Sequence, residues 1–191
     1  QISFPGRPVI HQQEVFTGYQ ESTDSAAQFG MDELTAAVAE ATRLGRKVMA
    51  HAHAGDGLKA AVLAGVASIE HGSLVDDEAI GFMKQKGTYL VPTLIILEEI
   101  VTDGVRKGVP ANSIAKATAI AVDRRARLRA AYKAGVKFAL GTDATSDIHG
   151  RNGEEFKYMV DILGATPMEA ITVGTMNGVP SENVTPPVAL L

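Results

Sequence analysis

Short apolar runs alternate with amphipathic segments along most of the chain. Four runs rich in Val, Ile, Leu and Ala predict buried strands, and the segments between them carry apolar residues at helical spacing. The predicted strands are residues 47–53, 66–71, 88–94 and 136–142. The predicted helices are residues 31–44, 58–64, 76–85, 112–134, 152–163 and 167–176, with a tight turn at 55–57 and a lid or insertion helix within 94–110. Strands that alternate with helices indicate an α/β fold with a parallel sheet.

Three of the apolar runs lead to a side chain that can bind a metal ion. The first reaches His51, the second reaches His71, and the fourth reaches Asp143. Because the carboxyl ends of parallel strands meet at one edge of a sheet, these side chains are expected to share a site. We therefore predict His51, His71 and Asp143 as metal ligands. Ordinary polar residues at strand ends, or a turn cap in the case of Asp143, remain the alternative.

Other polar residues near these strand ends are candidates for contact with a substrate. His53 lies two residues after His51 and so points to the same face of the strand, where it is expected to orient a ligand or a substrate group. Tyr89 and His149 are further candidate substrate contacts, although core packing is an equal alternative for Tyr89. Asp143 can also accept a proton from a water molecule, which makes it the candidate catalytic residue.

The composition narrows the possible classes of protein. With 191 residues, of which 46% are hydrophobic, the chain can bury the core of a globular domain. The net charge is -4, and the basic run at residues 123–129 is predicted to be a solvated helix face, so we expect no nucleic-acid partner. No apolar run approaches the roughly 20 residues of a membrane span. The sequence contains no GxGxxG or GxxxxGK[ST] motif.

The absence of cysteine excludes disulfides and leaves His, carboxylate or modified side chains as metal ligands. It fits a cytoplasmic protein. The sequence begins at Gln1 rather than Met, so a lost leader and a secreted or periplasmic location stay open. The oligomeric state is also open, a homo-oligomer included.

Four short segments, in this order and at this spacing, resemble the amidohydrolase superfamily. They are residues 48–53, 64–72, 90–94 and 140–143. The resemblance spans about residues 31–177 and is strongest to the branch of prolidase-like and imidazolonepropionase-related hydrolases. The segment 166–177 also resembles the helix that follows the last barrel strand in that superfamily.

The resemblance implies a (β/α)₈ barrel with one or two divalent metal ions, usually zinc. It implies that His51 is the ligand on strand five, His71 the ligand on strand six, and Asp143 the ligand on strand eight and the general acid or base. The implied reaction is hydrolysis of an amide or cyclic amide C–N bond by a metal-activated water. The implied substrate is a dipeptide or another small acyl-amino compound.

Two features of the superfamily have no counterpart in this sequence. The HxH motif of the first strand is missing, and no residue before His51 matches the carbamylated lysine that bridges two metals. We therefore predict an incomplete barrel containing strands five to eight. Its predicted parts are a loop region at 1–30 after a missing fourth strand, the C-terminal half of the barrel at 31–178, and an irregular tail at 179–191. Such a chain is not expected to be a competent enzyme alone.

Two other functions remain open. A deaminase of this type commonly carries a Glu shortly after the strand-five histidine, but Ala54, Gly55 and Asp56 follow His53 here, which disfavours deamination. A cyclic amidase also remains open within the superfamily. A metal-free, non-catalytic α/β domain that binds a partner through its open sheet edge is the alternative outside it.

Overall fold

The structure is a computed structural model that describes residues 29–144 and 148–177. The predicted loop region at 1–30 lies outside the described residues except for its last two, and the predicted tail at 179–191 lies outside them entirely. The chain forms two compact units, Gln1–Leu90 and Val91–Leu191.

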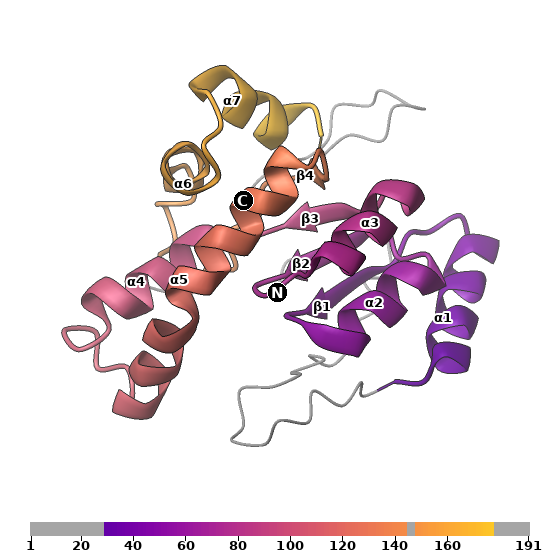
Figure 1. Ribbon diagram of the computed structural model, residues 1–191, viewed down its shortest axis with the longest axis horizontal. Coiled ribbons are helices and arrows are strands. Elements are labelled where there is room, and N and C mark those ends of the chain that lie inside the picture. The colour runs from indigo at the N-terminus through magenta and orange to yellow at the C-terminus, as the bar shows by residue number, and fades with distance from the viewer. Residues whose placement is uncertain (1–28, 145–147, 178–191) are drawn as a thin grey trace. The chain divides into compact units, whose positions relative to one another are not determined.

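The first unit alternates helices with the strands of a parallel sheet, as the sequence predicts. Its elements are α1 (Met31–Arg43), β1 (Met49–Ala52), α2 (Gly55–Ala64), β2 (Ser68–His71), α3 (Asp77–Lys86) and the start of β3 (Tyr89–Val91). β1 pairs in parallel with β2, and β3 follows β2 in the sheet. Figure 1 shows α1, α2 and α3 following one another along the same side of β1 and β2.

The core of the first unit lies between these helices and strands. The buried faces of the strands carry small or β-branched residues, Ala50 and Ala52 on β1 and Ile69 on β2. Helix α2 contacts both strands and buries Leu58 and Val62. Burial of this apolar surface is the main favourable contribution to the folding free energy of the unit.

The ends of the helices follow from local sequence signals. Asp76 caps α3 by accepting a hydrogen bond from the backbone N–H of Ala79. Gly65 ends α2 in the left-handed conformation, with φ 98°. The predicted tight turn at 55–57 is wrong, because these residues form the first turn of α2, where Asp56 interacts favourably with the helix dipole.

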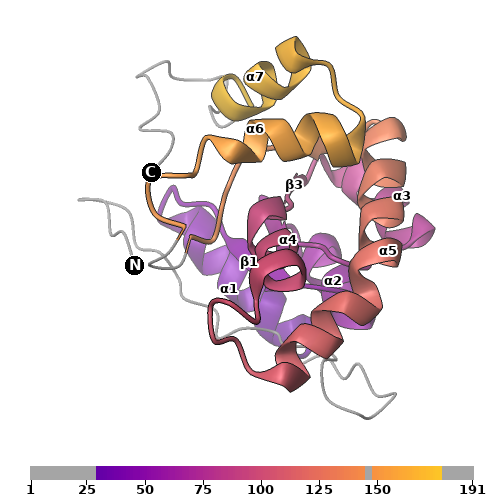
Figure 2. The same ribbon diagram turned by 90° about the vertical axis from the view of Figure 1, so that its left-hand side faces the viewer.

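The second unit is mainly helical. Its elements are α4 (Leu94–Asp103), α5 (Ala111–Lys133), β4 (Lys137–Phe138), α6 (Glu154–Tyr158), the π-helix η1 (Met159–Leu163) and α7 (Pro167–Thr175). Helix α7 lies beside α6 and η1 (Figure 2). The core of this unit is apolar and consists mainly of Leu94, Ile95, Leu128, Phe138, Met159 and Leu163.

Several predicted boundaries of the second unit hold and others do not. Thr166 and Glu169 form a capping box at the start of α7, which the sequence predicts as the helix 167–176. The predicted strand at 136–142 is confined to Lys137–Phe138. The predicted strand at 88–94 ends at Val91, since Pro92 lacks an amide donor and Thr93 adopts a left-handed conformation. The prediction that residues 123–129 form a solvated face is wrong for Arg124, which is 1% exposed.

Candidate active site

His51 and His71 lie next to each other at the ends of β1 and β2. In the parallel register of these strands, His51 is opposite Glu70 and His71 is opposite Ala52. The Nδ1 atom of His51 lies 3.0 Å from the Nε2 atom of His71, and both rings are half-buried. The strand pairing therefore brings together two of the three residues that the sequence predicts as metal ligands.

The backbone at the end of β2 is unusual. His71 has φ 71° and the following Gly72 has φ 52°, both in the left-handed region. A Cβ atom at Gly72 would lie 2.4 Å from Cδ1 of Leu90, so a larger residue would have to displace this side chain and would also be strained at this φ. For a histidine this conformation is uncommon, and strained backbone of this kind clusters at functional sites.

His53 completes a group of three imidazoles. Its ring stacks on that of His71, with 4.7 Å between centroids and an interplanar angle of 3°. Its Nδ1 atom lies 3.0 Å from the hydroxyl oxygen of Ser73, a buried residue that the sequence reasoning missed. The sequence feature that points to Ser73 is its position two residues after the predicted ligand His71, in the loop that follows β2. Contact with both Ser73 and His71 suits His53 to orienting a neighbouring ring.

The remaining predicted site residues occupy other parts of the chain. Tyr89 is half-buried and is the first residue of β3. Asp143 and His149 are exposed and belong to the second unit, the first with φ 53°. Asp143 follows an irregular segment beyond β4 and is not a strand end, which corrects the sequence prediction. The segment before Asp143 packs closely on β3, because a Cβ atom at Gly141 would lie 2.5 Å from Cγ1 of Val91.

Among residues 29–144 and 148–177, no three His, Asp or Glu side chains form a group that could hold a metal ion. We therefore ask whether the geometry of the His51–His71 pair suits two ligands of one zinc ion. Two nitrogens bound to one tetrahedral zinc ion at about 2.0–2.1 Å each lie roughly 3.3 Å apart. The observed 3.0 Å, a distance at which the two rings hydrogen-bond to each other, is close to this value. Imidazole nitrogen is a preferred donor for zinc, so the pair is compatible with two positions of such a site once the bridging proton is lost.

The sequence profile of the Amidohydrolase family matches residues 10–186, so the chain belongs to this family. It is 37% identical over 158 residues to an ochratoxinase of Aspergillus niger, a match that covers 83% of this chain and 32% of that protein. The crystal structure of A. niger ochratoxinase aligns with a TM-score of 0.69 and 39% identity, covering 78% of this chain and 33% of that one.

Two solved dipeptidase structures are about as similar to this chain as the ochratoxinase structure is. A Xaa-Pro dipeptidase with bound methionine in its active site gives a TM-score of 0.71 at 41% identity, and covers 78% of this chain and 37% of that chain. A prolidase complexed with N-methylphosphonate-L-proline gives 0.71 at 35% identity, with coverage of 78% and 36%. The chain thus spans about a third of the length of these relatives. The predicted fold, part of a TIM-like amidohydrolase barrel, is confirmed.

No helix among the described residues combines the length and apolar character needed to cross a membrane.

Proposed function

We propose that this chain provides part of the active site of a metal-dependent amidohydrolase that cleaves an amide bond in a dipeptide or another acyl-amino compound. The observation that carries the proposal is the His51–His71 pair, with 3.0 Å between facing ring nitrogens, in a chain of the amidohydrolase family. The names of similar proteins support it, since they include an ochratoxinase, a Xaa-Pro dipeptidase and a prolidase bound to a phosphonate derivative of proline.

His51, His71 and Asp143 would hold one or two divalent ions. Zinc is the first candidate, because the proposed donors are imidazole and carboxylate groups in a chain without cysteine. When bound, the ion would polarise the scissile carbonyl and lower the pKa of the attacking water. The match of this chain to the Amidohydrolase family supports metal use here.

The other proposed roles belong to side chains of this chain. The Asp143 carboxylate accepts the proton of the attacking water and passes it to the leaving nitrogen. His53, held between Ser73 and His71, keeps the ring of His71 in place or orients a substrate group. Tyr89 and His149 contact the substrate, which is a small molecule rather than a nucleic acid.

The proposed activity requires the part of the barrel that lies outside this sequence. The chain covers about a third of its relatives, and four strands do not close an eight-stranded barrel. The 191-residue chain alone is therefore expected to be inactive. The absence of cysteine fits a cytoplasmic enzyme, with a secreted or periplasmic one and a homo-oligomer still open.

The test uses the complete protein that contains this chain, expressed with zinc. Elemental analysis measures its metal content, and amino-acid release is followed with a panel of Xaa-Pro dipeptides and N-acyl amino acids. We expect one or two metal ions per chain, release of the amino acid, loss of activity on chelation and recovery on addition of zinc. A metal content near zero in folded protein contradicts the proposal. Release of ammonia without an amino acid favours a deaminase instead.

A further inference from the structure

The turn between β3 and α4 has a backbone that its own residues do not favour. We call residues 91–95 the β3–α4 corner. Thr93 lies at its centre with φ 48° and ψ 58°, and a β-branched residue in this left-handed region is a genuine outlier. The side chain of Thr93 does not cap α4, and the first turn of α4 contains no acidic residue. The first amides of α4 must therefore find partners elsewhere.

Those partners are the two carboxylate oxygens of Glu155. The backbone N–H of Leu94 donates to Oε2 at 3.0 Å, and the N–H of Ile95 donates to Oε1 at 2.9 Å. Glu155 belongs to α6 and is fully buried, with an exposed fraction of 0%. A buried carboxylate that lies some 60 residues from the helix it caps is unlike the local caps Asp76 and Thr166.

The carbonyl groups of the same corner are held by Arg124 of α5. Its Nη2 atom donates to the carbonyl oxygen of Pro92 at 2.6 Å and to that of Thr93 at 3.1 Å. Arg124 is also fully buried. The peptide group between Thr93 and Leu94 is thus held at both ends, its oxygen by Arg124 and its N–H by Glu155. Because the peptide on the other side of Thr93 is held as well, both φ and ψ of Thr93 are fixed from outside.

The corner adjoins the segment that carries Asp143. The approach to Asp143 packs so closely on the end of β3 that a Cβ atom at Gly141 would lie 2.5 Å from Cγ1 of Val91. Asp143 and Thr93 also share an unusual backbone: among the described residues, the non-glycine positions with positive φ are His71, Thr93 and Asp143. Two of these three are proposed ligands, and strain of this kind is characteristic of functional sites.

We propose that Arg124 and Glu155 are positioning residues for the hydrolytic reaction, because they hold the β3–α4 corner against which the segment of Asp143 packs. This inference rests on the proposed function. A helix cap alone would need only the two N–H groups, and a glycine at position 93 would adopt the same backbone without strain. Here two buried charged side chains instead hold four backbone groups of the corner in a conformation that threonine disfavours.

The test compares variants of the complete protein with matched neighbours. Glu155→Gln keeps the size of the side chain but turns one acceptor into a donor, and Arg124→Lys keeps the charge but loses the planar guanidinium. The controls are Glu154→Gln and Arg125→Lys, at exposed or half-exposed positions outside the corner. The measurements are kcat and KM for the dipeptide that the unmodified protein hydrolyses fastest, together with the melting temperature.

We expect kcat to fall on the order of 100-fold in Glu155→Gln, as for a displaced catalytic group, and less in Arg124→Lys. KM is expected to stay within about threefold, since the lost interaction acts in the transition state. The control variants should keep kcat and KM. If the unmodified protein is active, a normal kcat in both Glu155→Gln and Arg124→Lys would overturn this inference but not the proposed function. A rise in KM that accounts for the whole loss of kcat/KM would do the same.

If Glu155→Gln does not fold, the double variant Thr93→Gly/Glu155→Gln decides. Glycine takes the left-handed conformation without strain, so the corner can keep its shape without the carboxylate. Recovery of folded protein with measurable turnover supports the inference, and no recovery overturns it. Absence of hydrolysis by the unmodified protein would instead contradict the proposed function and, with it, this inference.

Discussion

The imidazole rings of His51 and His71 face each other across two adjacent parallel strands, with 3.0 Å between Nδ1 of the first and Nε2 of the second. Everything that sets this distance lies within the first unit: the register of β1 and β2, the left-handed backbone of His71, and the close approach at Gly72. The placement of the two rings is therefore set by features of the first unit itself.

Replacing either histidine by alanine should lower metal occupancy of the complete protein. Since loss of a residue behind a ligand already costs about 10- to 100-fold in metal affinity, His51→Ala and His71→Ala should each cost at least that. Elemental analysis after dialysis against a weak chelator measures the effect. His149→Ala, an exposed histidine of the second unit, is the control and should keep its metal. Unchanged occupancy in the first two variants would refute their assignment as ligands.

Asp143→Asn should abolish turnover and leave the fold intact. Asn is among the residues that tolerate a positive φ, so the backbone at φ 53° is expected to persist. Loss of the proton-transferring carboxylate should lower kcat by about 100- to 10,000-fold. The comparison is Asp161→Asn, an exposed carboxylate that pairs with Lys157 and should keep kcat. Retained activity in Asp143→Asn would remove this residue from the mechanism.

Ser73→Ala should weaken the placement of His53. The lost hydrogen bond to Nδ1 of His53 is worth about 1 kcal/mol of unfolding free energy. If His53 orients a substrate group, KM should also rise in the complete protein, while the metal content stays the same. A urea titration and steady-state kinetics measure the two effects. A Ser73→Ala protein with unchanged stability and unchanged KM would show that this hydrogen bond has no role.

The sequence predicted the order of the elements because hydrophobic periodicity and glycine or capping signals are local. The caps Asp76, Thr166 and Gly65, for example, act within a few residues of themselves. His51 and His71 could also be identified from the sequence as candidate metal ligands, because both follow apolar runs that form parallel strands.

The residues that sequence reasoning missed act over long distances in the chain. Arg124 looked like a member of a solvated basic helix face, yet it binds carbonyl groups some 30 residues away. Glu155 carries no local sign that it caps α4. The predicted strand at 136–142 is confined to Lys137–Phe138. At Arg124 and Glu155, tertiary contacts override the local pattern.

The stability of the protein should depend on the ionisation of Glu155. Burial raises the pKa of its carboxyl to about 7, against the lowering effects of the Leu94 and Ile95 amides and of Arg124. A carboxyl whose folded pKa exceeds its unfolded value contributes stability that is fully present below about pH 4.5 and is lost as pH rises through about 7. Glu155→Gln should remove this part of the pH dependence, a few kcal/mol at most, since one pKa unit corresponds to about 1.4 kcal/mol.

Urea unfolding at several pH values between 5 and 8 measures the effect of Glu155→Gln. Glu154→Gln is the matched control, because Arg151 lowers the pKa of Glu154 and so moves its titration below this window. A wild-type protein whose unfolding free energy changes with pH in the same way as that of Glu155→Gln would contradict the prediction.

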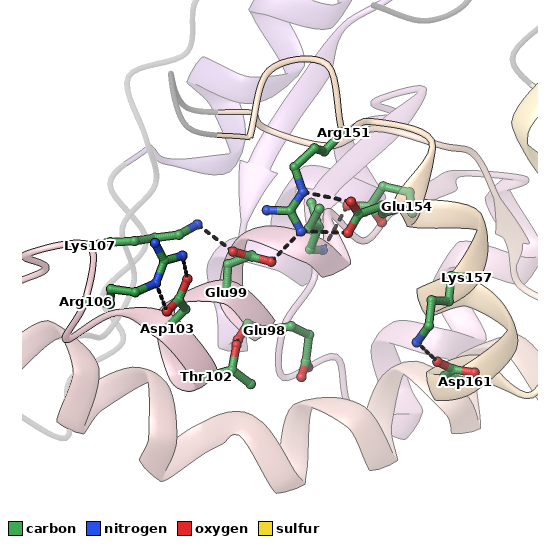
Figure 3. Close-up of polar contacts among 12 residues, drawn as sticks. Glu98, Glu99, Thr102, Asp103, Arg106, Lys107, Arg151, Glu154, Lys157 and Asp161 are labelled. Atoms are coloured by element: carbon green, nitrogen blue, oxygen red, sulfur yellow. Dashed lines mark hydrogen bonds and ion pairs between the residues drawn. The ribbon is translucent and has the colours of Figure 1, made fainter.

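Glu99 should contribute more to stability than an exposed ion pair does. It lies on α4 and pairs with both Lys107 and Arg151, as Figure 3 shows, and its side chain is only 11% exposed. Arg151 and Lys107 hold the pKa of Glu99 below its usual range, so its contribution to stability is present above about pH 4.5 and is lost as pH falls through the lowered pKa.

Glu99→Ala leaves two cations close together with their shared carboxylate gone, and should cost about 2 to 3 kcal/mol of unfolding free energy at pH 7. Asp161→Ala, which removes the exposed partner of Lys157, should cost much less. Equal losses in the two variants, measured by urea unfolding, would show that the partial burial of Glu99 adds nothing.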